Sequence, residues 1–190
     1  MTAETVIKQA PRRQPGDRPP PVEAVPAVAR ATLSPSRAAD FKTCPLLYRL
    51  RSIDRLPERP TLDQARGTLV HAVLERLFDL PAAARVPEAA YELVPGQWQR
   101  LVEADPDLAE LFDDADPAGQ AAFLDSARDL LGGYFAVEDP RRLEPAERES
   151  LISAVVGDDL LIRGYVDRLD VSPSGDLRVV DYKTGGAPRE

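Results

Sequence analysis

Cysteine is nearly absent from this chain of 190 residues, and the single thiol, Cys44, has no partner for an internal disulfide. No apolar run approaches the roughly 20 residues that cross a bilayer, and the N-terminus shows no apolar signal-peptide core. These absences argue against a disulfide-stapled secreted domain and a membrane protein. We therefore expect a cytoplasmic protein with no membrane partner.

An excess of positive charge is also absent, because the formal net charge is −8. Such a balance argues against a broadly basic surface for nucleic acid. The charge is uneven, however, since acidic residues concentrate between positions 103 and 116. We interpret that stretch as a solvated helical lobe, so DNA binding would need a local basic patch elsewhere.

Large apolar residues are few before residue 31, where prolines are frequent. This composition predicts a disordered, slightly basic, Pro-rich tail over residues 1–30. The hydrophobic fraction of 43% is enough for a real core in the rest of the chain. We expect one folded domain over residues 31–190.

Helical signals fill the first part of this domain. Ser34 and Pro35 predict a helix start, with the helix running to about residue 51 and Pro45 kinking or splitting it. A second helix is predicted from Thr61 or Asp63 to about residue 79. Its 3-4 spacing places on one packed face Gly67, Val70, His71, Leu74 and Phe78.

The next segment, residues 87–137, is also predicted to be helical, with breaks at Pro95-Gly96, Pro106 and Pro117. Its clearest helix spans residues 117–137. The expected inward positions of that helix are Ala121, Leu124, Leu131 and Phe135.

Strand formers dominate after residue 146 and predict strands over residues 147–156, 160–171 and 177–183. Turn residues at 157–159 and 172–176 join them as hairpins. The expected fold class is therefore α+β, with an N-terminal helical lobe followed by a three-stranded antiparallel β-meander. The meander ends so close to residue 190 that the core appears truncated.

The last predicted hairpin brings charged residues together. If Val171 pairs with Leu177, antiparallel counting sets Asp167 opposite Asp181 and puts Lys183 on the same face. Facing carboxylates repel each other unless a cation lies between them, and hard oxygen ligands suit Mg²⁺ or Mn²⁺. Lys183 would then position or deprotonate a water, or stabilise charge on a phosphate. The alternative for each residue is an ordinary exposed charge at a strand end.

The same register sets Asp170 across from Arg178. We interpret these residues as a cross-strand ion pair of modest energy.

A lone histidine on an apolar helix face, such as His71, is by itself more often a core residue than a ligand.

These residues resemble a known family. Gly164-x-x-Asp167 followed by Asp181-x-Lys183 resembles the core of the PD-(D/E)XK nuclease superfamily, which has an α/β restriction-endonuclease-like core. More narrowly, the chain over about residues 31–187 resembles the RecB-family nucleases. The further matches are Leu33-Ser34-Pro35-Ser36 with Phe41 and Cys44-Pro45-x-x-Tyr48, Gly67-x-x-x-His71, and Asp181-Tyr182-Lys183-Thr184-Gly185.

The resemblance implies roles for the matching positions. His71, Asp167, Asp181 and the backbone carbonyl of Tyr182 would be the metal ligands, for Mg²⁺ or Mn²⁺. Asp167, Asp181 and Lys183 would form the catalytic set, with Lys183 as the catalytic lysine.

Cys44 has two interpretations. A lone cysteine is usually a small buried hydrophobe. In many members of the RecB family the matching cysteine is the first of four thiolate ligands of a [4Fe–4S] cluster, which this chain cannot complete without cysteines further downstream. Either the chain is the front part of a longer protein, or the cluster has been lost. The family's downstream helix and final strand are also missing, which favours the first.

Three functional hypotheses remain open from the sequence. The first is a metal-dependent, exonuclease-like DNA nuclease, a phosphodiester hydrolase of DNA repair or recombination. The second is a truncated, non-catalytic RecB-like module that binds DNA or a helicase or recombination partner. The third is a helical protein with an incidental acidic hairpin.

Overall fold

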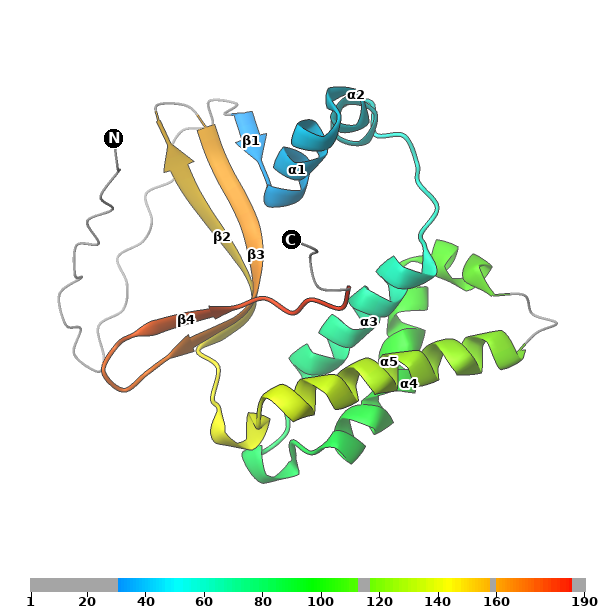
Figure 1. Ribbon diagram of the computed structural model, residues 1–190, viewed down its shortest axis with the longest axis vertical. Helices are drawn as coiled ribbons and strands as arrows, with labels where there is room; N and C mark the ends of the chain where they lie inside the picture. Colours follow the sequence, from blue (N-terminus) through cyan, green and yellow to red (C-terminus); the bar gives the residue numbers. More distant parts are fainter. Residues whose placement is uncertain (1–30, 113–116, 158–159, 186–190) are drawn as a thin grey trace. The chain divides into compact units, whose positions relative to one another are not determined.

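Helices and one β-sheet make up the computed structural model, which describes residues 31–112, 117–157 and 160–185 (Figure 1). The α+β class predicted from the sequence is confirmed. The predicted disordered tail, residues 1–30, lies outside the described residues. No helix in the described ranges is both long and apolar enough to cross a membrane.

The elements follow one another along the chain with short connections. One short strand opens the described part of the chain, helices and helical turns follow it, and three strands come last. In order they are β1 (Ala31–Leu33), α1 (Pro35–Thr43), α2 (Pro45–Tyr48), a π-helical turn (Arg49–Ile53), α3 (Leu62–Leu77), a 3₁₀ turn (Ala82–Ala84), α4 (Pro87–Ala104), a 3₁₀ segment (Pro106–Leu111), α5 (Pro117–Val137), a 3₁₀ turn (Pro140–Arg142), β2 (Glu147–Val156), β3 (Leu160–Val171) and β4 (Leu177–Val180).

The N-terminal helix is capped and split as the sequence predicts. The Ser34 hydroxyl accepts a hydrogen bond from the Arg37 N–H at 3.3 Å, which satisfies a free donor of the first turn. Cys44 adopts an extended conformation between α1 and α2, and Pro45 begins the second piece. Proline cannot donate to the helix of α1, so the helix restarts there.

The core lies among α3, α4 and α5. α3 begins with a capping box, in which Thr61 and Gln64 each bond the other's backbone N–H. The helix then buries Leu69, Val73 and Leu77 in addition to the predicted Val70, Leu74 and Phe78. The buried side chains cover one face of α3 and fix the helix, which supports the residues that it carries on its other face.

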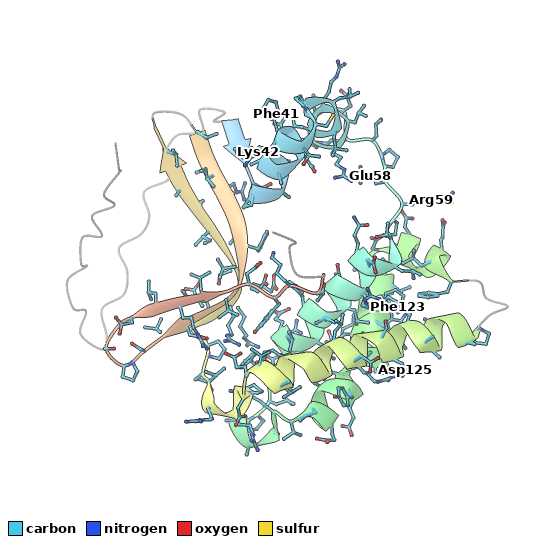
Figure 2. All side chains as sticks on the ribbon, viewed as in Figure 1. Phe41, Lys42, Glu58, Arg59, Phe123 and Asp125 are labelled. Atoms are coloured by element: carbon cyan, nitrogen blue, oxygen red, sulfur yellow. The ribbon has the colours of Figure 1, made fainter. Side chains whose placement is uncertain are left out.

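One prediction about α4 and one about α5 are wrong. α4 continues through Pro95 with no break, because burial of Val94 and Trp98 on its inner face offsets the hydrogen bond that the proline removes. In α5 the predicted Leu131 is buried, and Leu124 and Phe135 are half-buried against the core, but Ala121 is exposed. Figure 2 shows Phe123 on the side of α5 toward the other helices and Asp125 on the outer side.

The sheet has four strands, so the predicted three-stranded meander is incomplete. β2 and β3 have the predicted bounds and pair from Val156↔Leu160 to Glu147↔Leu169. β4 pairs antiparallel with β3, and the short β1 pairs parallel with β3. Since β2 occupies one edge of β3, β1 and β4 share the other edge.

The predicted register of the second hairpin is confirmed. Val171 pairs with Leu177, and Asp170 pairs with Arg178, whose guanidinium lies 2.6 Å from the Asp170 carboxylate. β4 ends at Val180, three residues before the predicted end. Residues 181–185 therefore leave the ladder and run beside α3 (Figure 1).

Candidate metal centre

The edge of β3 between its partners β1 and β4 has no strand partner among the described residues, over residues 163–167. α3 and the segment after β4 come together next to this stretch. They bring His71 and Tyr182 to Asp167 of β3. Three separate elements thus supply one group of polar atoms, and α3 is distant in sequence from the other two.

His71 is fixed by the backbone of Tyr182. Its Nε2 lies 2.8 Å from the Tyr182 carbonyl oxygen. A carbonyl can only accept, so Nε2 carries the proton and donates. In the neutral ring, Nδ1 then keeps its lone pair, and it lies 3.6 Å from Asp167 Oδ2. A histidine held through one nitrogen by a backbone carbonyl, with the other nitrogen free, has the usual orientation of a metal ligand.

Asp167 holds the same stretch of backbone from the other side. Its Oδ2 accepts the Tyr182 N–H at 2.6 Å. The Tyr182 phenol accepts from buried Arg168 at 2.9 Å, and burial raises the pKa of this phenol to about 12. Tyr182 is therefore held through its N–H, its carbonyl and its phenol. Its carbonyl, which the resemblance predicts as a metal ligand, accepts the hydrogen bond of His71 in this structure.

Glu149 is a member of the group that the sequence analysis missed. Ligand atoms of His71, Glu149 and Asp167 all lie within 4.8 Å of one another. The β2–β3 register sets Glu149 opposite Asp167, but the strand pairing passes from Arg148 directly to Ser150. Antiparallel counting from the turn at 157–159 sets Glu149 opposite Asp167, just as counting from the next turn set Asp167 opposite Asp181. The sequence therefore contained a signal for this residue.

Glu149 also has a strained backbone, with φ at +45°. A non-glycine residue in this region costs of order 1–3 kcal/mol and tends to occur at functional sites. Its neighbour Arg148 bonds the Glu75 carbonyl of α3 and the Asp79 carboxylate just after that helix. The anchored neighbour and the turned backbone together aim the Glu149 carboxylate at Asp167.

The electrostatics of the group suit a divalent cation. Burial, and then the nearby Asp167 carboxylate, raise the pKa of Glu149. Two carboxylates and an imidazole therefore converge, and the repulsion between the two negative charges would be removed by a bound cation. Because carboxylates favour Mg²⁺ and Mn²⁺ and imidazole accepts several transition metals, the donor set fits such an ion. A cavity of about 610 Å³ lined by Gly67, His71, Glu75 and Glu149 gives access to it.

Asp181 and Lys183 lie outside this group in the described structure. Their side chains pair with each other, with Lys183 Nζ 2.7 Å from Asp181 Oδ2, and both are more than half exposed. They line a second cavity of about 710 Å³. Side chains alternate along an extended segment, so Tyr182 points to the helices while its two neighbours point away.

The hydrogen bond to Asp181 raises the pKa of Lys183. The ammonium is therefore charged at neutral pH. Of the roles predicted for this lysine, stabilising negative charge fits that state better than removing a proton from water.

Gly67 explains how α3 comes so close to the segment after β4. A Cβ built on Gly67 would lie 3.0 Å from the Thr184 hydroxyl oxygen, a contact that forces a shift. One helical turn later, His71 reaches the Tyr182 carbonyl. The Gly-x-x-x-His spacing thus places a close approach and a candidate ligand on the same helix face.

Cys44 is exposed at the junction of α1 and α2, so the expectation of a small buried hydrophobe is wrong. A [4Fe–4S] cluster needs four protein ligands, usually thiolates. The chain contains one cysteine. Its own donor set therefore does not fit the cluster.

Replacing Glu149 with glutamine is expected to stabilise the metal-free protein by about 0.2–1 kcal/mol, because one of two facing charges is removed. The same change should reduce the rise in melting temperature that Mn²⁺ gives. Thermal unfolding in EDTA and in Mn²⁺ measures both effects. Glu147→Gln, on the exposed start of β2, is the matched control. An unchanged Mn²⁺ shift in Glu149→Gln would remove this residue from the centre.

Residues 32–190 match the family model of the PD-(D/E)XK nuclease superfamily. A search of curated proteins gives no significant match.

Proposed function

The chain belongs to the PD-(D/E)XK nuclease superfamily, and from this premise we propose that it is a metal-dependent deoxyribonuclease that hydrolyses phosphodiester bonds. The observation that carries the proposal is the convergence of His71, Glu149 and Asp167 within 4.8 Å. Asp181 and Lys183 are adjacent along the chain to Tyr182, which bonds two members of that group.

Each residue of the site has a proposed task. His71 Nδ1 and the carboxylates of Asp167 and Glu149 would hold a Mg²⁺ or Mn²⁺ ion, which would lower the pKa of a water and polarise the phosphoryl group. The Tyr182 carbonyl keeps His71 in the required tautomer. The Lys183 ammonium stabilises the negative charge that develops on the scissile phosphate.

Asp181 changes partner in this proposal. In the described structure its carboxylate pairs with Lys183. A substrate phosphate competes for the same ammonium, because phosphate and carboxylate are both anionic acceptors. Its arrival would release Asp181 for the ligand role that the family resemblance gives it.

The finer assignments are also proposals. The matching motifs support a RecB-like, exonuclease-like enzyme of DNA repair or recombination that works in the cytoplasm, with DNA and a helicase or recombination protein as partners. Residues 31–190 would be its nuclease domain. A [4Fe–4S] cluster belongs to this proposal only in a longer form of the protein that supplies further cysteines beside Cys44.

The test is cleavage of end-labelled linear DNA, single-stranded and double-stranded, with Mg²⁺ or Mn²⁺. We expect shortened products with either ion and none in EDTA, because the cation activates the water. Double-stranded circles separate the need for ends from internal cutting. Cleavage that persists in EDTA, or no cleavage with either ion, would contradict the proposed activity.

A non-catalytic role is the second candidate. The observation in its favour is the exposed Asp181–Lys183 pair, which lies outside the group formed by His71, Glu149 and Asp167. A protein of this kind would bind DNA or a helicase without cutting. Tight binding of linear DNA together with intact DNA after long incubation in Mn²⁺ would favour it.

A further inference from the structure

The second cavity, of about 710 Å³, lies where β3 has no partner strand between β1 and β4. Its size falls within the roughly 300–1,000 Å³ that is typical of ligand pockets. The start of α1 forms one wall, β2 and β3 form another, and Asp181 and Lys183 complete the lining. We call this cavity the Tyr165 pocket.

Tyr165 is its main aromatic surface. The residue is 69% exposed. Among the described residues its ring has no aromatic partner and its hydroxyl makes no hydrogen bond. Tyr165 stands two residues before Asp167 on β3, so both side chains are on the same face of the strand. At about 3.3 Å per residue, the two positions are roughly 7 Å apart along the strand.

The charge of the pocket differs from that of the protein as a whole. Its lining includes three basic side chains, those of Arg37, Arg163 and Lys183, against one carboxylate, that of Asp181. Neither Arg37 nor Arg163 forms an ion pair with any residue that the structure describes. In a chain of net charge −8, this pocket is the local basic patch that binding to DNA requires.

Serine hydroxyls complete the polar wall. Ser34 and Ser36 line the pocket at the start of α1, with their hydroxyl oxygens 3.0 Å apart. Hydroxyl groups of this kind often contact phosphate oxygens in protein–DNA interfaces. An exposed aromatic ring beside arginines and hydroxyls is therefore a chemically coherent site for one nucleotide.

We propose that the Tyr165 pocket binds one unpaired nucleotide of a DNA strand, with its base stacked on the Tyr165 ring and its phosphate facing Arg163 and Arg37. This inference rests on the proposed function, because it places that nucleotide beside the phosphate to be cut. A base inside a duplex is already covered on both faces, so the pocket selects a strand that is single at this point.

Binding of a fluorescein-labelled oligothymidylate in EDTA, followed by fluorescence anisotropy, tests the pocket without cleavage. Tyr165→Ala is expected to raise Kd by about 5- to 100-fold, because the stacking surface is lost. Tyr165→Phe keeps the ring and should bind as the parent does. Leu177→Ala, on β4 with the same 69% exposure, is the matched control and should leave Kd unchanged.

The salt dependence of Kd tests the phosphate contact. Arg163→Ala should lower the slope of log Kd against log salt by about 0.7, the value for one phosphate contact of a single strand. Arg100→Ala removes the same charge from an exposed position of α4 and should keep the parent slope. A general loss of fold would not produce this difference between two exposed arginines.

The outcomes separate this inference from the proposed function. If the parent cuts DNA and Tyr165→Ala binds and cuts equally well, the nucleotide-binding role of the pocket is overturned and the proposed nuclease activity stands. A Phe variant as weak as the Ala variant also overturns it, because the hydroxyl and not the ring would then be responsible. If the parent binds the oligonucleotide through Tyr165 but never cuts DNA, the nucleotide-binding role is supported and the proposed nuclease activity is contradicted. A pocket that serves a protein partner would leave oligothymidylate binding unchanged in every variant, which overturns the inference.

Discussion

Replacing Lys183 with methionine is expected to slow metal-dependent DNA cleavage by about 100- to 1,000-fold, the usual cost of removing one group that stabilises transition-state charge. Methionine keeps most of the length of the side chain and removes its ammonium. The pKa of Lys183 is raised, so the lost group is a full positive charge at neutral pH. The rate of cleavage of labelled linear DNA in Mn²⁺ measures the effect.

The same variant should still bind the metal. Lys183 does not belong to the group formed by His71, Glu149 and Asp167. The rise in melting temperature with Mn²⁺ is therefore expected to match that of the parent. Asp167→Asn should lose both this shift and cleavage, because its carboxylate belongs to the group. Lys42→Met, an exposed lysine of α1 (Figure 2), is the control for loss of a positive charge. Lys183→Met that cleaves at the parent rate would exclude the lysine from catalysis.

Replacing Arg168 with methionine is expected to lower the free energy of unfolding by about 3–5 kcal/mol, the usual effect of breaking a buried ion pair. Arg168 is completely buried. Its guanidinium donates to Glu138 at 2.7 Å, to Asp170 at 3.0 Å and to the Tyr182 phenol. It also lies 5.3 Å above the centre of the Phe78 ring. Removing it leaves two largely buried carboxylates without their main partner. Urea unfolding followed by circular dichroism measures the loss.

Arg178 provides a matched control for this prediction. It pairs with the same two carboxylates, Glu138 at 2.9 Å and Asp170 at 2.6 Å, but is 53% exposed. Water and salt screen such a pair, so Arg178→Met should cost at most about 1 kcal/mol. Arg168→Lys should recover little, because an ammonium cannot reproduce the planar fork of the guanidinium. Equal losses for the two arginine-to-methionine variants would contradict the role assigned to burial.

The ion pairs of Arg168 also connect the core to the candidate metal centre. Burial by itself raises the pKa of Glu138, but hydrogen bonds from Arg168 and its charge outweigh this and hold that pKa below its usual value. The charged network fixes the Tyr182 phenol, and the Tyr182 backbone in turn fixes His71 and Asp167. Weaker Mn²⁺ binding should therefore accompany the loss of stability in Arg168→Met.

Local patterns in the sequence predicted much of this fold correctly. The Ser34 cap, the Thr61 start, the bounds of β2 and β3 and the register of Asp170 with Arg178 all depend on neighbouring residues or on one short turn. Such features follow from side-chain capping and strand alternation, which act over a few residues. The register of the first hairpin was equally accessible, and counting it would have placed Glu149 opposite Asp167.

Long-range packing decided the rest. The strand β1 has three residues and exists through its parallel pairing with β3, some 130 positions later in the chain. α4 passes through Pro95 because its inner face is buried, and propensity at the proline cannot reveal that.

The order of motifs along the chain was enough to predict the chemical groups of the candidate site: a histidine on a helix, carboxylates on neighbouring strands and a lysine after them, as in a nuclease superfamily. Which of these groups meet depends on tertiary packing. The end of β4 at Val180 turns Asp181 and Lys183 toward the Tyr165 pocket, while buried Arg168 holds Tyr182 against His71. The direction of a side chain beyond a strand end depends on what packs against the backbone, and those contacts come from distant parts of the chain.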